Sequence, residues 1–123
     1  MRPATSAAPE PGVVLAKAAL AAADRLGLRS RQLARVLGSS EASVSRLQRG
    51  RDLEPSSKEG ELALLFLRLF RSLDALVGGD DDKARSWLSA PNRQFGAAPV
   101  EKIMTVEGLV DVVQYLDAMR GRL

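Results

Sequence analysis

The side chains that could do chemistry in this chain are mainly arginines and serines, gathered between residues 30 and 51. The 123-residue sequence has no histidine and no cysteine, which excludes imidazole acid–base catalysis, thiolate chemistry and metal sites built on those ligands. What remains is hydrogen bonding by guanidinium, hydroxyl and carboxylate groups, which contact phosphates and base edges in nucleic acids. The candidates are Arg31, Ser40, Glu41, Ser43, Ser45, Arg46, Arg49 and Arg51.

Within this set, Arg46 is the best candidate for reading a base, because its planar fork matches O6 and N7 of guanine. Glu41 could accept a hydrogen bond from a cytosine amine, or could simply neutralise a neighbouring arginine. The serines are small enough to allow close approach and could bond phosphates. The other arginines of the set are expected to contact phosphates and to make affinity depend on salt. Arg35, outside the set, is expected to be a solvated surface residue.

The elements that would position these side chains are two short helices joined by a tight turn over residues 30–49. Their apolar positions are in register for packing against each other: Leu33, Leu37, Val44 and Leu47. The small Ala34 stands where the two helices would cross, and Gly38 takes the turn. The pattern predicts a DNA-binding helix-turn-helix whose second helix enters the major groove. The alternative is an ordinary helical hairpin.

The rest of the chain also reads as helical. We expect about seven helices, over residues 13–26, 30–37, 40–48, 62–77, around 84–88, over 99–104 and after 105, with no run that alternates like a strand. Ser30 and Thr105 are expected to be N-cap residues. The fold class is therefore all-α: an N-terminal helix-turn-helix followed by a small C-terminal helical domain. Residues 1–11 are expected to form a disordered tail, 12–58 the DNA-binding domain and 59–123 the dimerisation and partner-binding domain.

The most regular apolar stripe lies in the segment from 62 to 77. Its members recur at helical spacing: Leu62, Leu65, Phe66, Leu69, Phe70, Leu73, Leu76 and Val77. The stripe could pack a dimer, or it could belong to the core of its own chain, and both can hold for different residues. Trp87 poses a similar choice between core packing and contact with a partner.

Charge and composition narrow the function classes. Between Arg25 and Lys58 there are eight basic and three acidic residues, a net charge of +5, whereas the chain from Asp74 onward is net acidic. Such a basic half fits nucleic acid. No apolar run is long enough to cross a membrane, and no signal peptide is evident, so we expect a cytoplasmic protein. No catalytic constellation, cofactor motif or metal site is expected, because the acidic run from Asp80 is better explained as a helix N-terminus.

The order of features in the second half resembles the C-terminal domain of the Xre/MbcA/ParS antitoxins. The features run from residue 65 to the end of the chain: Leu69–Phe70 before a glycine pair, Ala84 with Trp87–Leu88, Pro91–Asn92, Phe95–Gly96, Pro99, and Thr105 with Gly108 before the last apolar helix. With the helix-turn-helix, the resemblance covers about residues 14–123. It implies a protein partner, a toxin of the RES-domain type that acts on NAD. It also implies that the antitoxin is a homodimer, that its complex with the toxin is a larger assembly, and that it represses its own promoter.

The resemblance further implies that the C-terminal domain docks on the toxin and obstructs its active site. The toxin-facing pieces would be the loop 92–96 and the stretch 119–123. The residues expected there are Asn92, Arg93, Phe95, Arg120, Arg122 and Leu123. Arg120 and Arg122 could instead serve only the helix dipole, although a terminal arginine could also plug a pocket that binds a phosphate. The alternative function is a stand-alone helix-turn-helix regulator whose second half only dimerises or senses a ligand.

Overall fold

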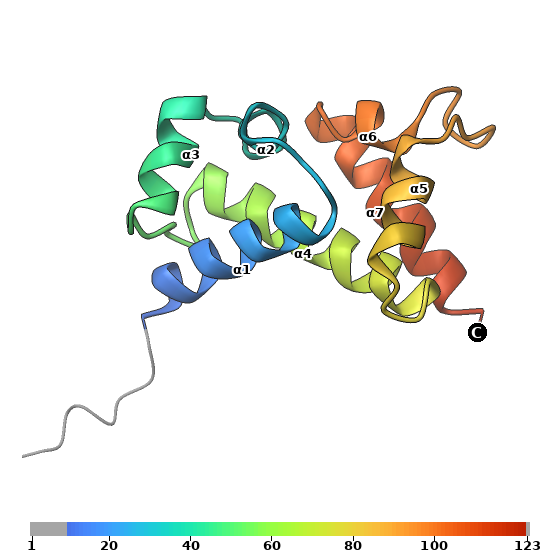
Figure 1. Ribbon diagram of the computed structural model, residues 1–123, viewed down its shortest axis with the longest axis horizontal. Helices are drawn as coiled ribbons and strands as arrows, with labels where there is room; N and C mark the ends of the chain where they lie inside the picture. Colours follow the sequence, from blue (N-terminus) through green and yellow to red (C-terminus); the bar gives the residue numbers. More distant parts are fainter. Residues whose placement is uncertain (1–9, 123) are drawn as a thin grey trace, which may run out of the picture.

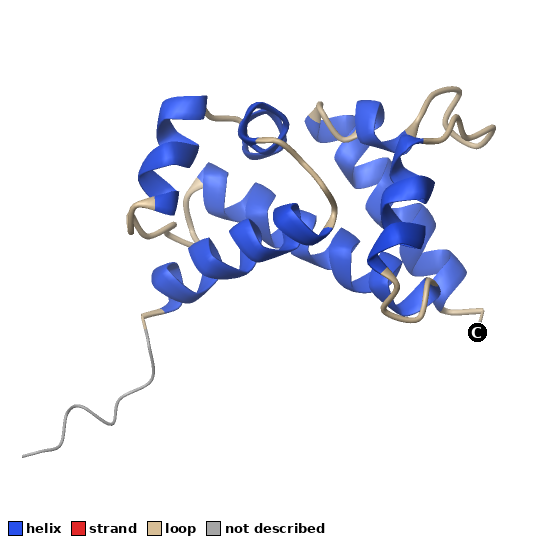
Figure 2. Ribbon diagram, viewed as in Figure 1, coloured by secondary structure: helices blue, strands red, loops and turns tan. Residues whose placement is uncertain are grey.

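The computed structural model describes residues 10–122, and within that range helices joined by loops make up the fold, as Figures 1 and 2 show. The helices are α1 (Pro11–Arg25), α2 (Ser30–Leu37), α3 (Glu41–Gln48), α4 (Lys58–Leu76), α5 (Asp81–Ser89), α6 (Pro99–Lys102) and α7 (Val106–Arg120). The only extended pairing in this range is one isolated bridge between Asn92 and Ala97. The all-α prediction is confirmed. None of the described helices is long and apolar enough to cross a membrane.

The N-terminal boundary differs from the prediction. The first helix begins at Pro11 rather than after Gly12, because proline is well suited to the first turn, where its missing N–H is not needed. Of the expected disordered tail 1–11, residues 1–9 lie outside the described residues.

Helix α4 connects the two halves of the molecule. In Figure 1, α1, α2 and α3 gather at one side and α5, α6 and α7 at the other, while α4 passes behind α1 and extends from the first group to the second. The helix packs against α1 and α2 in the first half and, most extensively, against α7 in the second. The two halves therefore share one element.

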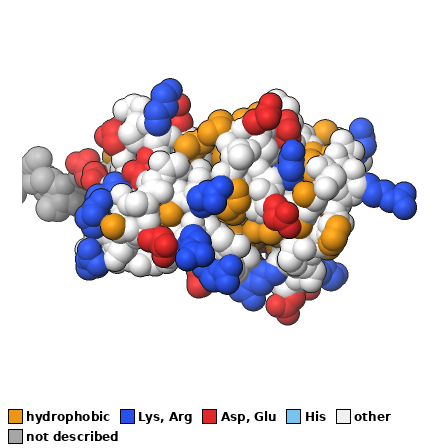
Figure 3. Space-filling model, turned by 90° about the horizontal axis from the view of Figure 1, so that it is seen from above, with side chains coloured by type: hydrophobic (Ala, Val, Ile, Leu, Met, Phe, Trp, Pro, Cys, Tyr) orange, Lys and Arg blue, Asp and Glu red, His pale blue; other side chains and the backbone are white. Residues whose placement is uncertain are grey.

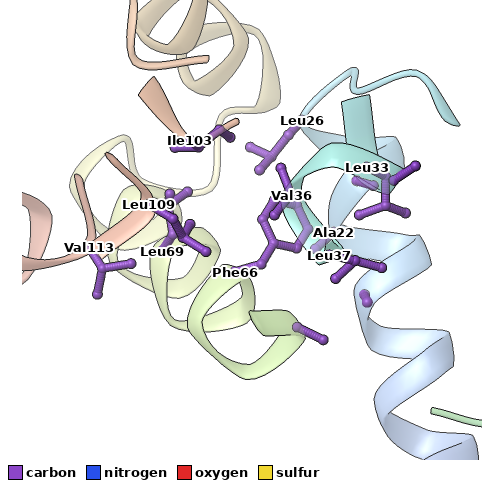
Figure 4. Packing of buried hydrophobic residues seen from close by; sticks show 14 of the residues in the cluster. Ala22, Leu26, Leu33, Val36, Leu37, Phe66, Leu69, Ile103, Leu109 and Val113 are labelled. Carbon is purple, nitrogen blue, oxygen red and sulfur yellow. The ribbon is translucent and has the colours of Figure 1, made fainter. Parts of the chain in front are cut away.

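The apolar core is continuous across this shared helix. Phe66, in the middle of α4, is completely buried. Figure 4 shows its ring beside Val36 and Leu37 of α2, with Leu69 and Leu109 farther along towards α7. Burying a phenylalanine side chain in this way stabilises a fold by about 1.5–3 kcal/mol relative to leaving it exposed.

The apolar stripe of residues 62–77 belongs to this core. Phe66, Leu69 and Leu73 are buried, and the remaining members of the stripe are partly buried against the same cluster. The core interpretation of the stripe is thus confirmed. The large apolar side chain of α4 that is exposed is Leu64, which lies off the stripe.

Side-chain caps fix several helix starts. The hydroxyl of Ser40 accepts a hydrogen bond from the Ser43 N–H (3.1 Å), and that of Thr105 accepts one from the Gly108 N–H (3.1 Å). Each bond satisfies an N–H that has no partner within its helix. The predicted cap at Thr105 is confirmed.

The predicted cap at Ser30 is wrong. Ser30 is the first residue of α2, and Arg29 is its N-cap in extended conformation. The backbone N–H of Arg29 donates to Oε1 of Gln32 at 2.8 Å. In a capping box the side chain three positions after the N-cap bonds the backbone N–H of the N-cap residue, and Gln32 makes this bond. Helix α2 therefore starts at Ser30, one residue earlier than it would if Ser30 were the cap.

Candidate DNA and protein interfaces

The helix-turn-helix has the packing that its sequence predicted. Leu33 and Leu37 of α2 and Val44 and Leu47 of α3 are all at most 3% exposed. Gly38 ends α2 with φ of +66°, a left-handed conformation that glycine adopts without strain. Burial of one side of α3 leaves its opposite side to the solvent.

The exposed side of α3 carries arginines that are held by neighbouring serines. Nη2 of Arg46 donates to Oγ of Ser43 at 3.0 Å, and Nη1 of Arg49 donates to Oγ of Ser45 at 2.6 Å. Hydrogen bonds between exposed groups contribute little net stability, because water competes for both partners. The guanidinium groups can therefore exchange these serines for bases or phosphates.

Glu41 lies at the first position of α3, directly after the capping Ser40. One of its carboxylate oxygens is 3.7 Å from Nε of Arg31, and the side chains are 61% and 79% exposed, respectively. In this pair the carboxylate of Glu41 neutralises a neighbouring arginine, one of the two roles expected for it. A pair so exposed contributes little, so both residues remain free to turn towards a ligand. The same two residues line an open hollow with Arg29 and Ser30 at the start of α2.

Arg51 is engaged within the protein. Its guanidinium forms two hydrogen bonds with the carboxylate of Glu59 (3.1 and 3.3 Å) and also donates to the backbone carbonyls of Ser43 (3.2 Å) and Asp52 (3.3 Å). The side chain is 31% exposed. Arg51 thus ties α3 to the start of α4, a role that its sequence position did not reveal.

The face that carries α2 and α3 is rich in basic side chains. Figure 3 views the molecule from above the view of Figure 1, with α3 towards the left, and shows basic side chains scattered among acidic ones at that end and a row of them along the lower edge from the middle of the molecule. Arg29 is exposed, stands next to the predicted contact Arg31 and lines the hollow at the start of α2. Arg29 joins the candidate set, although its sequence position carried no signal for this role.

A second candidate surface is an aromatic cluster in the other half. It consists of Trp87 in α5, Phe95 in the following loop and Tyr115 in α7, all partly exposed. The rings of Trp87 and Tyr115 stack at 6.3 Å, and Phe95 meets Tyr115 and Trp87 edge-on, with ring centres 5.2 and 6.4 Å apart. Three of the chain's five aromatic residues are therefore gathered here. Tyr115 was missed because it lies beside the apolar face of its helix and has no local signal.

The loop that presents Phe95 is held by its own hydrogen bonds. Oδ1 of Asn92 accepts from the Gln94 N–H (2.8 Å), and the Asn92 carbonyl accepts from the N–H of Phe95 (3.1 Å). The bridge between Asn92 and Ala97 closes the turn. Arg93 is exposed at its tip and makes no hydrogen bond with another described residue. An open hollow of about 400 Å³, lined in part by Phe95 and Tyr115, lies beside the loop.

The predicted toxin-contacting residues at the C-terminus lie away from the loop that presents Phe95. Arg120 and Arg122 are exposed; Nη1 of Arg120 donates to Oγ of Ser72 at 3.4 Å, and Nη1 of Arg122 to Sδ of Met119 at 3.6 Å. Leu123 lies outside the described residues. Figure 1 shows the loop before α6 and the C-terminus at opposite ends of α7. The structure therefore does not bring the two predicted toxin-facing pieces together.

A salt-bridge cluster holds the two candidate surfaces in a fixed relation. Arg25, at the end of α1, pairs with Asp74 of α4 and Asp81 of α5, both at 2.9 Å, and lies over the ring of Phe70 at 4.8 Å. Nε of Arg85 donates to the Arg25 carbonyl at 2.9 Å. The side-chain hydrogen bond from Arg25, with the attraction of its charge, lowers the pKa of Asp81, and the same bond raises the pKa of Arg25.

Comparisons with known families match both halves of the chain. The model of the antitoxin Xre-like helix-turn-helix domain matches residues 7–68. The model of the antitoxin Xre/MbcA/ParS C-terminal toxin-binding domain matches residues 72–122. A comparison with functionally curated proteins gave no match. The first match includes the exposed side of α3, and the second includes the aromatic cluster.

Proposed function

The chain belongs to the family of antitoxins with an Xre-like helix-turn-helix domain, and from this premise we propose that it neutralises a NAD-consuming toxin of the RES type and represses its own operon. At the coarser level it is a DNA-binding, toxin-neutralising antitoxin. The observation that carries the proposal is the order of the two matched domains in one chain. The choice of a RES-type toxin is supported by the resemblance of the segment from residue 65 onward to antitoxins that pair with such toxins.

Operator recognition is assigned to α3. Arg46 would read a guanine in the major groove, with Glu41, Ser43 and Ser45 near base edges or phosphates. Ser40, Arg31 and Arg49 would contact phosphates. Arg51 would act mainly by holding α3 in place through Glu59, since its guanidinium is already bonded there.

Toxin neutralisation is assigned to the surface around the aromatic cluster. Partly exposed aromatic rings beside an arginine are typical of interface residues that carry much of the binding energy. Phe95 would be the apolar anchor, with Asn92 fixing the loop and Arg93 supplying a charge. Arg120, Arg122 and Leu123, at the far end of α7, would make a separate contact. A single toxin that engages both must extend along α7, about 22 Å.

The proposal is tested first by neutralisation. The protein encoded by the adjacent reading frame is expressed with and without this chain while growth and the NAD pool are followed. We expect growth arrest and NAD loss with the neighbour alone, and recovery of both when the chain is present. A neighbour that arrests growth without NAD loss would overturn the RES assignment alone. A harmless neighbour, or one that the chain does not protect against, would favour the stand-alone regulator.

Two matched variants separate the two activities. Arg46→Ala on α3 should lose repression of a promoter reporter and keep neutralisation. Phe95→Ala combined with Arg93→Glu should lose neutralisation and keep repression. If the second variant still neutralises, the aromatic cluster is not the toxin-binding surface. If Arg46→Ala represses like the unmodified chain, another side chain reads the operator. Far-UV circular dichroism confirms that each variant is folded.

A further inference from the structure

An apolar surface lies outside the surfaces proposed for DNA and toxin binding. Among the described residues, Val14 and Leu64 are two of the three large apolar side chains that are strongly exposed, each at 49%. They line the same shallow hollow between α1 and α4. We call this surface the α1–α4 patch and define it by Pro11, Val14, Ala18, Leu64, Leu67 and Arg71.

We propose that the α1–α4 patch is the surface through which two copies of this chain form a homodimer. The inference rests on the proposed operator binding, and it adds a surface through which two copies would bind the operator together. Proteins with a helix-turn-helix usually bind two half-sites about one helical turn apart as symmetric dimers. No residue of α2 or α3 belongs to the patch, so two copies joined there keep their recognition helices free.

The charges along α4 favour a second copy as the occupant. Glu61 lies three residues before Leu64, and Arg71 lies seven residues after it, both exposed. In a symmetric interface two α4 helices would run antiparallel, which sets Leu64 against Leu67 of the second copy. The same arrangement brings Glu61 near Arg71 of the second copy, twice over by symmetry.

Arg71 is available for such a pair. It makes no hydrogen bond or ion pair with another described residue, in contrast to Arg68 one turn earlier, which donates to Asp117 at 2.6 Å. Glu61 has one weak competitor, the ammonium of Lys58 at 3.3 Å, whose side chain is 91% exposed. The patch therefore combines an apolar centre with opposite charges at its two ends.

The third exposed apolar residue provides a matched control. Val106, 58% exposed, lies at the start of α7, outside the patch. Leu64→Glu and Val106→Glu each place a carboxylate at an exposed helical position, so neither should disturb the core. Sedimentation velocity over a range of concentrations measures the monomer–dimer equilibrium of each purified full-length variant.

We expect the unmodified chain and Val106→Glu to dimerise alike, and Leu64→Glu to raise the dissociation constant at least about tenfold. Glu61→Arg and Arg71→Glu should each weaken the dimer, and the double variant should restore it. A monomeric unmodified chain would overturn the inference. So would a Leu64→Glu variant that dimerises normally, or a Val106→Glu variant that dissociates as strongly.

Cross-linking gives an independent test, since the chain contains no cysteine. Leu64→Cys should be joined into a covalent dimer by a short bis-maleimide, and Val106→Cys should not. Equal yields from both variants would contradict the assigned surface. Neutralisation of the toxin is measured on the same variants. If the unmodified chain neutralises the toxin but is a monomer, the dimer inference fails and the proposed neutralisation stands. If it dimerises but does not neutralise, the proposed neutralisation fails and the dimer inference stands.

Discussion

Among single residues, Arg46 has the most direct link to sequence-specific binding, because its guanidinium is exposed and, within residues 10–122, is held only by the hydroxyl of Ser43. Arg46→Ala should weaken binding to the cognate operator by about 1–3 kcal/mol and relax the preference at one base pair. Fluorescence anisotropy with the operator and single-base variants measures both effects. Arg35→Ala, at an exposed position of α2, is the control and should change affinity little.

Salt dependence distinguishes a phosphate contact from a base contact. Arg31→Ala should lower affinity for specific and non-specific duplexes to a similar extent, and should reduce the slope of log affinity against log salt by about one. A loss confined to the cognate sequence would contradict the phosphate role. The slope is obtained from titrations at several salt concentrations.

Asp81 is expected to make stability depend on pH in the acidic range. Its pKa is lowered in the folded chain by the hydrogen bond from Arg25, so its contribution is present at neutral pH. That contribution is lost as pH falls from about 4 through the lowered pKa. Asp81→Asn should therefore lower the melting temperature at pH 7 and have progressively less effect on further acidification.

The matched control for this change is Asp82→Asn, since Asp82 is 94% exposed and its partner Arg85 is 3.7 Å away. Its melting temperature should remain close to that of the unmodified chain at each pH. An equal loss in both variants at pH 7 would mean that the charge at the start of α5, rather than the pair with Arg25, supplies the stability.

The residues that the sequence could identify are those with a local signal. Arg46 and Ser45 follow from the spacing of buried positions in α3, and Asn92 and Phe95 stand in a recognisable loop. Arg51 was expected to contact a phosphate, and its bond to Glu59 could not be foreseen, because Glu59 is reached only after the chain turns into α4. The aromatic cluster escaped for the same reason, as its three rings come from different elements.

The position of α7 depends on a close backbone contact with α6 as well as on its N-cap. Gly108, in the first turn of α7, lies so near the Lys102 carbonyl that an added Cβ would collide with this backbone oxygen. Gly108→Ala should therefore reduce the free energy of unfolding by about 1–3 kcal/mol or more, as overpacking does. Urea denaturation measures the change.

Gly121→Ala is the control for this substitution. Gly121 has φ of −67°, and an added Cβ would meet only ordinary contacts. Its effect should be small, and a slight gain is consistent with a less flexible unfolded chain. A Gly108→Ala variant as stable as this control would show that α7 can shift away from α6.

Elements were more predictable than their ends. Period and glycine placement located the seven helices of the part of the chain that the structure describes, and Thr105 was correctly identified as a cap. Ser30 was assigned as a cap because serine is a common N-cap residue, whereas Gln32 bonds the backbone of Arg29 and moves the helix start. Propensity alone does not resolve such a competition between neighbouring side chains.

As a whole, the molecule should unfold as one unit, because Phe66 lies in a core shared by both halves. Phe66→Ala should cost about 3–5 kcal/mol and lower the melting temperature of both halves together. Differential scanning calorimetry should show one transition, before and after the change. Val106→Ala, at an exposed position, should have little effect. Two separated transitions would mean that the halves are independent.

The division of the chain into a DNA-binding domain up to residue 58 and a second domain after it stays a prediction. Composition could not reveal that α4, which begins there, contacts both α1 and α7. Which helices pack against each side of α4 depends on how those helices are arranged in space. The sequence pattern of α4 alone does not specify that arrangement.

The shared helix also limits how such a chain can be recombined. A crossover at residue 58 would join a foreign first half to an α4 shaped around Val36 and Leu37, and Phe66 would meet a surface that does not fit it. A crossover after α4 would move the same mismatch to α7. New combinations of operator and toxin should therefore arise more readily by substitution on the exposed sides of α3 and the aromatic loop than by exchange of intact halves.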